Sequence, residues 1–161
     1  MLDMQILKKL SNIHVQIVED DEVISYAIKQ SLVKHCKRVE IASDGLQGFE
    51  MFEQNKPDVL IVDINLPHLN DLEMVASIRE ISPHIPVIIM TSHDSSDNML
   101  KSIDQGVYIY LRKPIGIEEL QTGLLMATKD IYNAHISLEH GYEYENQSKQ
   151  LIGPNNIKIT Y

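Results

Sequence analysis

Residues 58–67 read DVLIVDINLP, an almost continuous aliphatic run that contains a carboxylate at Asp63 and ends at a proline. A short apolar run of this kind is typical of a strand that is buried on both faces, as in a parallel sheet. An unpaired carboxylate is costly to bury. We therefore expect a strand over 58–62 with Asp63 at its end, held by a cation or used in chemistry.

On both sides of this run, short apolar segments alternate with amphipathic ones. The expected strands are 13–18, 38–43, 58–62, 86–91 and 107–111. The expected helices are 21–34, 44–55, 71–81, 95–106 and 117–132. This alternation predicts an α/β fold, namely a doubly wound, five-stranded parallel sheet with helices on both faces.

Polar residues follow the expected strands at the edge where ligands bind to such sheets. They are Glu19 and Asp20 after the first strand, Asp63 after the third, Thr91 at the end of the fourth and Lys113 after the fifth. Three crowded carboxylates repel one another unless cations neutralise them. Lys113 supplies one positive charge, and Mg²⁺ suits the remaining oxygen ligands. The pattern predicts Asp63 as a nucleophile toward a phosphoryl group, with Thr91 as a hydrogen-bond donor.

The segments IVEDDEV, PDVLIVDINLP, IPVIIMTS and YLRKP, in this order, resemble the receiver domain of two-component response regulators over about residues 13–130. The resemblance implies a flavodoxin-like sheet with strand order 2-1-3-4-5. It implies that Asp63 is the phosphoacceptor and that Lys113 contacts the phosphoryl group through a cis peptide bond to Pro114. The implied Mg²⁺ ligands are Glu19, Asp20, Asp63 and the main-chain carbonyl of Asn65.

The same resemblance assigns two further pairs of residues. Thr91 and Tyr110 are the implied switch pair, in which the aromatic ring turns inward when Thr91 moves toward the phosphate. Asn65 and His93 lie two residues after Asp63 and Thr91, at positions that tune the lifetime of the phosphorylated state in this family. We expect His93 to hinder or orient the attacking water, and the decay of the phosphorylated state to depend on pH, because histidine titrates near neutral pH.

These residues imply a phosphorylation-dependent signalling switch. A sensor histidine kinase would donate the phosphoryl group, and phosphorylation would alter homodimerisation or partner binding. The protein would catalyse only its own phosphoryl transfer and dephosphorylation. A phosphate-independent dimerisation or scaffold domain stays open as an alternative. A phosphohydrolase is disfavoured, because Asn65 occupies the position of the general-acid aspartate in haloacid-dehalogenase-type enzymes.

We expect three segments: an N-terminal extension over 1–12, a receiver domain over 13–135, and a linker with a C-terminal β-hairpin over 136–161. Leu2, Ile6, Leu7 and Leu10 recur at helical spacing, which predicts a short helix packed on the domain or on a partner. KQLI and IKIT flank GPNN, which predicts the hairpin. It resembles the opening strands of winged-helix output domains, so we expect transcription regulation, with DNA bound only through an output domain that this chain lacks.

Composition narrows the functional classes. The 161 residues carry a formal net charge of −9, which disfavours nonspecific binding to nucleic acid or an anionic membrane, although a small basic site is compatible with it. The one cysteine excludes an internal disulfide and fits a reducing compartment. No stretch approaches the length of a membrane span, and no export signal is recognisable. We therefore expect a cytoplasmic protein.

Overall fold

The computed structural model describes residues 2–64, 69–91, 107–139, 143–145, 150–152 and 158–160. Asn65, His93 and the helix expected over 95–106 lie outside the described residues.

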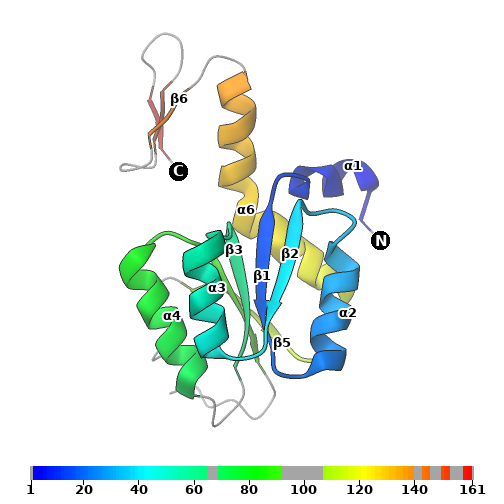
Figure 1. Ribbon diagram of the computed structural model, residues 1–161. Helices are drawn as coiled ribbons and strands as arrows, with labels where there is room; N and C mark the ends of the chain where they lie inside the picture. Colours follow the sequence, from blue (N-terminus) through cyan, green and yellow to red (C-terminus); the bar gives the residue numbers. More distant parts are fainter. Residues whose placement is uncertain are drawn as a thin grey trace.

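The central element is a five-stranded parallel sheet with the strand order β2-β1-β3-β4-β5, which confirms the predicted order (Figure 1). Its strands are β1 (His14–Val18), β2 (Arg38–Ala42), β3 (Val59–Ile64), β4 (Val87–Thr91) and β5 (Val107–Arg112). The predicted end of the third strand is wrong, because β3 continues through Asp63 to Ile64. Its pairing with β4 explains this, since Asp63 lies opposite Met90 and Ile64 opposite Thr91.

Helices cover both faces of the sheet (Figure 1). They are α2 (Glu22–Leu32), α3 (Gly45–Asn55), α4 (Leu69–Ile81) and α6 (Ile117–Glu139). One buried apolar cluster joins the sheet to Leu32 of α2 and to Leu120 and Leu124 of α6. The other joins the sheet to Phe52 of α3 and Ile78 of α4. The β3 side chains alternate between the two clusters, as the pleat of a doubly covered strand requires.

The structure extends α6 beyond the predicted end at about residue 132, to Glu139. Between Gly123 and Gly141 the sequence contains neither glycine nor proline, so no helix-breaking residue stops it earlier. Since β5 ends at the carboxyl edge of the sheet, α6 runs back toward the edge where the strands begin (Figure 1).

The N-terminal extension packs on this domain. This was one of the two predicted arrangements, the other being packing on a partner. It forms α1 (Met4–Leu7), capped by the Asp3 side chain, and a 3-10 turn, η1 (Lys8–Leu10). Leu7 and Leu10 are buried in the cluster that contains α2 and α6. Ile6 is 42% exposed, so the predicted apolar stripe is only partly buried.

Short loops at the carboxyl edge follow from helix caps. Asp21 caps α2 by accepting hydrogen bonds from the N–H groups of Val23 and Ile24, at 2.9 and 3.1 Å. Asp44 caps α3 in the same way by accepting from the N–H of Gln47 at 2.8 Å. Side-chain caps of this kind satisfy N–H groups that have no partner within the helix. Each helix therefore starts within a few residues of the preceding strand.

The C-terminal part forms a separate antiparallel sheet with the order β6-β7-β8. Its strands are β6 (Glu143–Glu145), β7 (Gln150–Ile152) and β8 (Lys158–Thr160). Leu151 lies opposite Ile159 in the β7–β8 pair, which confirms the predicted hairpin. The strand β6 was not predicted, and the expected segment boundaries stay predictions.

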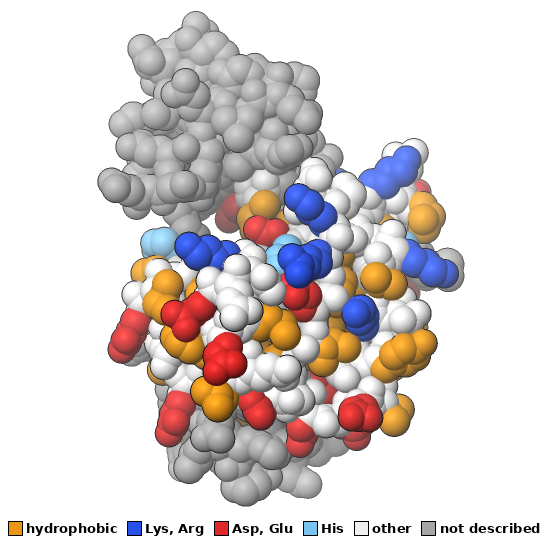
Figure 2. Space-filling model, in the orientation of Figure 1, with side chains coloured by type: hydrophobic (Ala, Val, Ile, Leu, Met, Phe, Trp, Pro, Cys, Tyr) orange, Lys and Arg blue, Asp and Glu red, His pale blue; other side chains and the backbone are white. Residues whose placement is uncertain are grey.

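Charged side chains are unevenly distributed over the surface. Lys and Arg side chains gather in the upper half of the view in Figure 2, around α1 and the starts of β1 and β2, whereas Asp and Glu lie mostly in the lower half. Among the described helices, none combines the length and hydropathy needed to cross a lipid bilayer.

Candidate functional site

The site lies at the carboxyl edge of the sheet, where β1, β3 and β5 end. Glu19 and Asp20 directly follow β1 in the short connection to α2. The Glu19 N–H donates to the Ala42 carbonyl at 3.0 Å, so pairing with β2 continues past the end of β1. This pairing and the α2 cap hold both carboxylates beside Asp63.

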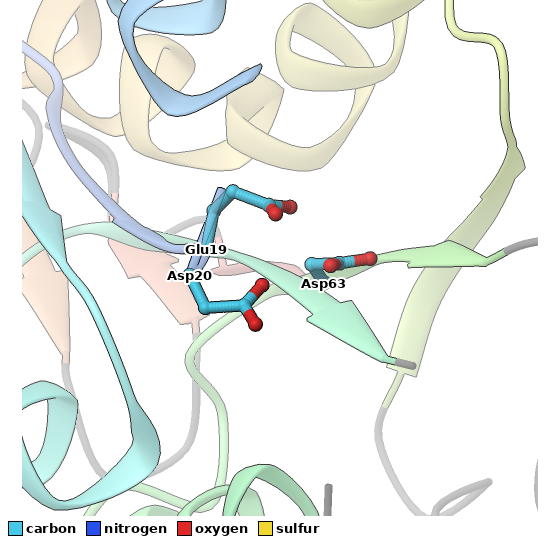
Figure 3. Close-up of side chains that lie close together, drawn as sticks. All are labelled: Glu19, Asp20 and Asp63. Carbon is cyan, nitrogen blue, oxygen red and sulfur yellow. The ribbon is translucent and has the colours of Figure 1, made fainter. Parts of the chain in front are cut away.

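Three carboxylates meet here, as predicted. One side-chain oxygen from each of Glu19, Asp20 and Asp63 lies within 4.8 Å of the others. Figure 3 shows Glu19 and Asp20 arriving from the end of β1 and Asp63 from β3. Glu19 is 2% and Asp63 3% exposed, whereas Asp20 is exposed to solvent. The cluster is therefore buried at its base and open to solvent at Asp20.

Lys113 provides the cationic partner that the burial of Asp63 requires. Its Nζ lies 2.7 Å from Asp63 Oδ1 and 3.5 Å from Glu19 Oε2. Its backbone N–H donates to the Thr91 carbonyl at 2.7 Å, which ties the end of β5 to the end of β4. The Lys113–Pro114 peptide bond is cis, as the family resemblance implied.

The electrostatics of the site show an excess of negative charge. Burial, together with the neighbouring Asp63 carboxylate, raises the pKa of Glu19 to about 8, against a hydrogen bond from the Asp21 N–H and the positive charge of Lys113. Burial alone would lower the pKa of Lys113, but the hydrogen bond and the charge of Asp63 outweigh it, so this pKa is raised. The Lys113 ammonium group contacts Asp63 and Glu19, in a cluster of three carboxylates, so a further positive charge would be favourable here.

A hard divalent cation fits this donor set. All three side chains offer oxygen atoms, the ligands that Mg²⁺ prefers, and the exposed Asp20 leaves positions for water or phosphate oxygens. The fourth implied ligand, the carbonyl of Asn65, lies outside the described residues. A cation here would also favour the charged form of Glu19, which burial disfavours.

The implied switch pair occupies neighbouring strands. Thr91 is 4% exposed at the end of β4, one residue past Met90, which lies opposite Asp63. Tyr110 lies opposite Ile89, on the face covered by α3 and α4, and is half-buried against the apolar cluster there. Because side chains alternate along a strand, Thr91 shares this face with Ile89. His93, the second lifetime position, lies outside the described residues.

Sequence reasoning missed one contributor to the site. The backbone N–H of Asp21 donates to Glu19 Oε1 at 3.0 Å and fixes this carboxylate. Every residue except proline carries such a group, so residue type gives no signal for it. The one available signal was the capping role of Asp21 in α2. A cap at this position implies a tight turn after β1, which could direct the Asp21 N–H toward Glu19.

Comparisons with known proteins agree with this geometry. The family described as response regulator receiver domain matches residues 15–124. A protein of Mycobacterium ulcerans named response regulator MprA is 31% identical over 121 residues, which cover 73% of this chain and 52% of that protein. The protein of the same name from Mycobacterium tuberculosis strain H37Rv is also 31% identical over 121 residues. The chain thus spans about half the length of the curated relatives it matches.

Solved structures give the same result. A response regulator receiver domain protein from Clostridium thermocellum superposes with a TM-score of 0.66 at 30% identity, covering 73% of this chain and 94% of that one. The receiver domain of the Francisella response regulator 1452 gives 0.64 at 27% identity, covering 74% of this chain and 99% of that one.

Proposed function

The chain belongs to the response regulator receiver family, and from this premise we propose that it is a signalling switch that accepts a phosphoryl group on Asp63 with Mg²⁺ as cofactor. One observation carries the proposal: a buried carboxylate that lies 2.7 Å from a lysine ammonium and beside two further carboxylates. A purely structural ion pair needs only one acid, so the additional acids favour a cation site.

The chemistry is a phosphoryl transfer from a phosphohistidine of a sensor histidine kinase. An oxygen of Asp63 attacks phosphorus, the phosphorus–nitrogen bond breaks, and the departing imidazole takes up a proton from solvent, which leaves an aspartyl phosphate. Lys113 is close enough to Asp63 to contact the incoming phosphoryl oxygens. Bound Mg²⁺ would offset the negative charge on these oxygens. Attack by water later releases inorganic phosphate and restores Asp63.

Phosphorylation would reach the surface through Thr91 and Tyr110. The Thr91 hydroxyl would donate to a phosphoryl oxygen, and the half-buried Tyr110 ring would move further into the space beside β4. This rearrangement would favour homodimerisation or binding of another partner. Asn65 and His93 would set how long the phosphorylated form persists. The position of Tyr110 supports this proposal, because Tyr110 lies on the same face of the sheet as Thr91.

The proposed output is transcription regulation. The curated relatives are about twice as long as the matched region, and the β7–β8 hairpin follows α6 where a further domain would begin. DNA would be bound chiefly by such an output domain, in the cytoplasm. The site residues themselves support only the phosphoryl-accepting step.

The test is phosphorylation by acetyl phosphate in the presence of Mg²⁺, read out by intact-protein mass and by peptide mapping after reduction of the acyl phosphate with borohydride. We expect one phosphoryl group, located on Asp63. Asp63→Asn should abolish the adduct, and Glu22→Gln, a carboxylate-to-amide change at an exposed position of α2, should leave it intact. Chelation of Mg²⁺ should also prevent labelling.

Two other outcomes would identify the alternatives. Sustained release of phosphate from p-nitrophenyl phosphate, dependent on Asp63, would indicate a phosphohydrolase. Absence of an adduct with acetyl phosphate, phosphoramidate and beryllofluoride would contradict the switch and favour a phosphate-independent scaffold. An adduct that persists in Asp63→Asn would place the acceptor elsewhere.

A further inference from the structure

Six exposed cations gather at the edge of the sheet opposite the carboxylate site. We call this surface the basic edge, and its members are Lys8, Lys9, Lys34, Lys37, Arg38 and Lys56. They are six of the 14 Lys and Arg residues in a chain whose formal net charge is −9. Such a concentration at one edge does not follow from composition.

The topology explains why these cations share one edge. Lys8 and Lys9 precede β1, Lys34 and Lys37 precede β2, and Lys56 precedes β3. Parallel strands begin at the same edge of their sheet, so the three connections that precede adjacent strands lie side by side. The upper half of Figure 2 shows the resulting group of Lys and Arg side chains.

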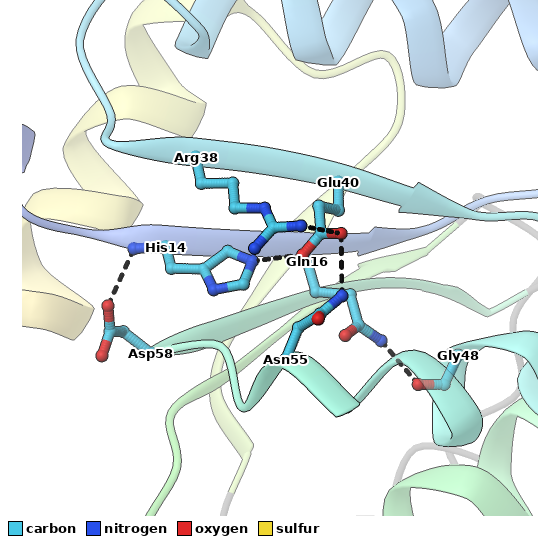
Figure 4. Close-up of polar contacts among 7 residues, drawn as sticks. All are labelled: His14, Gln16, Arg38, Glu40, Gly48, Asn55 and Asp58. Carbon is cyan, nitrogen blue, oxygen red and sulfur yellow. Dashed lines mark hydrogen bonds and ion pairs between the residues drawn. The ribbon is translucent and has the colours of Figure 1, made fainter. Parts of the chain in front are cut away.

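Two carboxylates near this edge, Asp58 and Glu40, are already engaged in hydrogen bonds within the protein (Figure 4). Asp58 accepts from the His14 N–H at 2.8 Å. Glu40 contacts the His14 ring at 2.5 Å and accepts from Asn55 at 2.9 Å and from Arg38 at 3.2 Å. Both carboxylates are half-buried. Because Asp58 and Glu40 are engaged in these contacts, they offset little of the positive charge of the exposed lysines. Two acids in the neighbouring segments, Asp3 and Glu53, are exposed.

The acidic site does not cancel the field at the basic edge. The strands between the two edges have five or six residues, which corresponds to roughly 17–20 Å. This exceeds the Debye length of about 8 Å at physiological ionic strength, so the two edges are electrostatically independent to a good approximation. The acidic net charge of the chain therefore does not prevent a positive electrostatic potential at the basic edge.

The position of α6 indicates which polyanion would meet the basic edge. This helix packs against η1, which carries Lys8 and Lys9, as it passes the edge that holds the cations, and it continues beyond that edge (Figure 1). A domain that follows α6 would therefore start on the same side of the sheet as the basic edge, and DNA held by such a domain could reach these cations. Five of the six cations are lysines, which contact phosphates as point charges without a shaped pocket.

We propose that the basic edge contacts the phosphate backbone of duplex DNA, next to the DNA held by an output domain that follows α6. This proposal rests on the proposed transcription-regulating function and adds a DNA contact made by the receiver domain itself. The contact carries no sequence specificity, because phosphate contacts position a protein on DNA without reading its bases. It adds affinity and orients the receiver domain, with its acidic site directed away from the DNA.

The test uses the full 161-residue chain and a fluorescein-labelled random-sequence duplex, with binding followed by fluorescence anisotropy. If three of the six cations contact phosphates, the slope of log affinity against log salt should be about −2.7, which corresponds to a roughly 40-fold loss of affinity when salt is raised fourfold. Lys37→Glu should weaken binding about fivefold or more at low salt and reduce the slope by about one. The double variant Lys34→Glu/Lys37→Glu should weaken it further.

The matched control is Arg112→Glu, which changes the net charge by the same amount at an exposed position on the opposite edge. At physiological ionic strength, where the two edges are screened from each other, it should bind DNA like the unmodified chain. Circular dichroism should show native helix content in every variant. Equal weakening by Arg112→Glu and Lys37→Glu would overturn the proposal. So would absence of binding at about 200 μM protein in low salt, a concentration above the usual range of nonspecific dissociation constants.

Two further arms separate other polyanions from DNA. Vesicles containing phosphatidylglycerol test a membrane surface, and polyglutamate tests an acidic protein. Stronger binding to either than to the duplex, with sensitivity to Lys37→Glu, would overturn the DNA assignment. Acetyl phosphate labelling of the same samples keeps the two proposals distinct: labelling of Asp63 without DNA binding refutes only this inference, and DNA binding without labelling refutes only the phosphoryl-accepting role.

Discussion

At the scale of single residues, the site holds three carboxylates and one lysine ammonium group among the described residues. Lys113 forms an ion pair with Asp63, and the pKa of the buried Glu19 is raised to about 8. A carboxyl group that is forced toward its neutral form indicates that positive charge is lacking nearby. Since binding of a ligand to the native state stabilises it, Mg²⁺ should stabilise the folded protein.

We expect thermal unfolding in EDTA to occur at a lower temperature than in Mg²⁺. A concentration of Mg²⁺ at 100 times its dissociation constant should add about 2.7 kcal/mol to the free energy of unfolding. Asp20→Asn should largely remove this increment, because the exposed carboxylate is lost from the ligand set. Differential scanning calorimetry with and without Mg²⁺ measures the effect.

The control for this prediction is Glu22→Gln, which removes a nearby exposed carboxylate outside the three-acid cluster. It should retain the Mg²⁺-dependent increment. If Glu22→Gln and Asp20→Asn lose the increment equally, Mg²⁺ acts through general screening of acidic charge and not through the cluster.

Cys36 gives a prediction with a defined pH dependence. Burial raises the pKa of its thiol to about 12, so the thiolate is scarce in the folded protein at pH 8. Alkylation by iodoacetamide at this pH should be slower by about three powers of ten than in the urea-unfolded chain, because only the thiolate reacts. Mass spectrometry over time measures both rates.

The same pKa fixes the sign of the effect on stability. Above about pH 8.5 the unfolded chain releases the thiol proton while the folded protein retains it until about pH 12. The free energy of unfolding should therefore fall as the pH rises through this interval, and Cys36→Ala should reduce the fall. Native alkylation as fast as in the unfolded chain would contradict the burial of this thiol.

At the scale of elements, the close approach of α3 to the sheet depends on Gly48. A Cβ atom at this position would lie 2.6 Å from Met74 Sδ and 3.0 Å from Val18 Cγ2. The Gly48 carbonyl also accepts a hydrogen bond at 2.7 Å from Gln16, which is fully buried in β1. A larger residue would thus separate α3 from both β1 and α4.

We expect Gly48→Ala to lower the free energy of unfolding by about 1–3 kcal/mol, as overpacking of a core does. Gly123→Ala is the matched control in α6, since its Cβ would meet only Leu111 and Ile109 at 3.8 and 3.9 Å. That change should be neutral or stabilising by up to about 1 kcal/mol, because alanine favours helix more than glycine. Urea unfolding of both variants compares them, and an equal effect would refute the packing argument.

The elements also show where reasoning from sequence is sufficient. Most strands and helices are within two residues of the prediction, since apolar periodicity and capping residues such as Asp21 and Asp44 are local signals. The end of β3 was predicted too early because pairing with β4 through Ile64, and not the local sequence, decides it. The length of α6 was underestimated because the sequence after the predicted end contains no glycine or proline to stop the helix before Gly141.

At the scale of the whole molecule, the winding of the chain determined how much of the site could be predicted. Glu19, Asp20, Asp63 and Lys113 were expected together because each lies at or next to the end of a strand of one parallel sheet, and the structure brings them together. The basic edge was not predicted. Its lysines precede their strands in three separate connections, so only the common origin of parallel strands reveals them as one surface.

The N-terminal extension is part of the same whole-molecule arrangement, because its apolar side chains complete the core between α2 and α6. Leu10 is fully buried in this cluster. Leu10→Ala should therefore lower the free energy of unfolding by about 2–5 kcal/mol, the usual cost of a buried leucine truncation. Urea unfolding, with an unchanged dependence on denaturant, would measure this loss.

Ile6→Ala provides the control within the same segment, since Ile6 is 42% exposed. It should change the free energy of unfolding by no more than about 0.5 kcal/mol. If Leu10→Ala is as mild as Ile6→Ala, the extension does not pack on this domain in solution. Its apolar side chains would then be available to a partner, the second of the two arrangements that its helical spacing allows. A large effect of Leu10→Ala alone instead makes the extension a structural part of the receiver domain, which holds η1 against α6 where the basic edge lies.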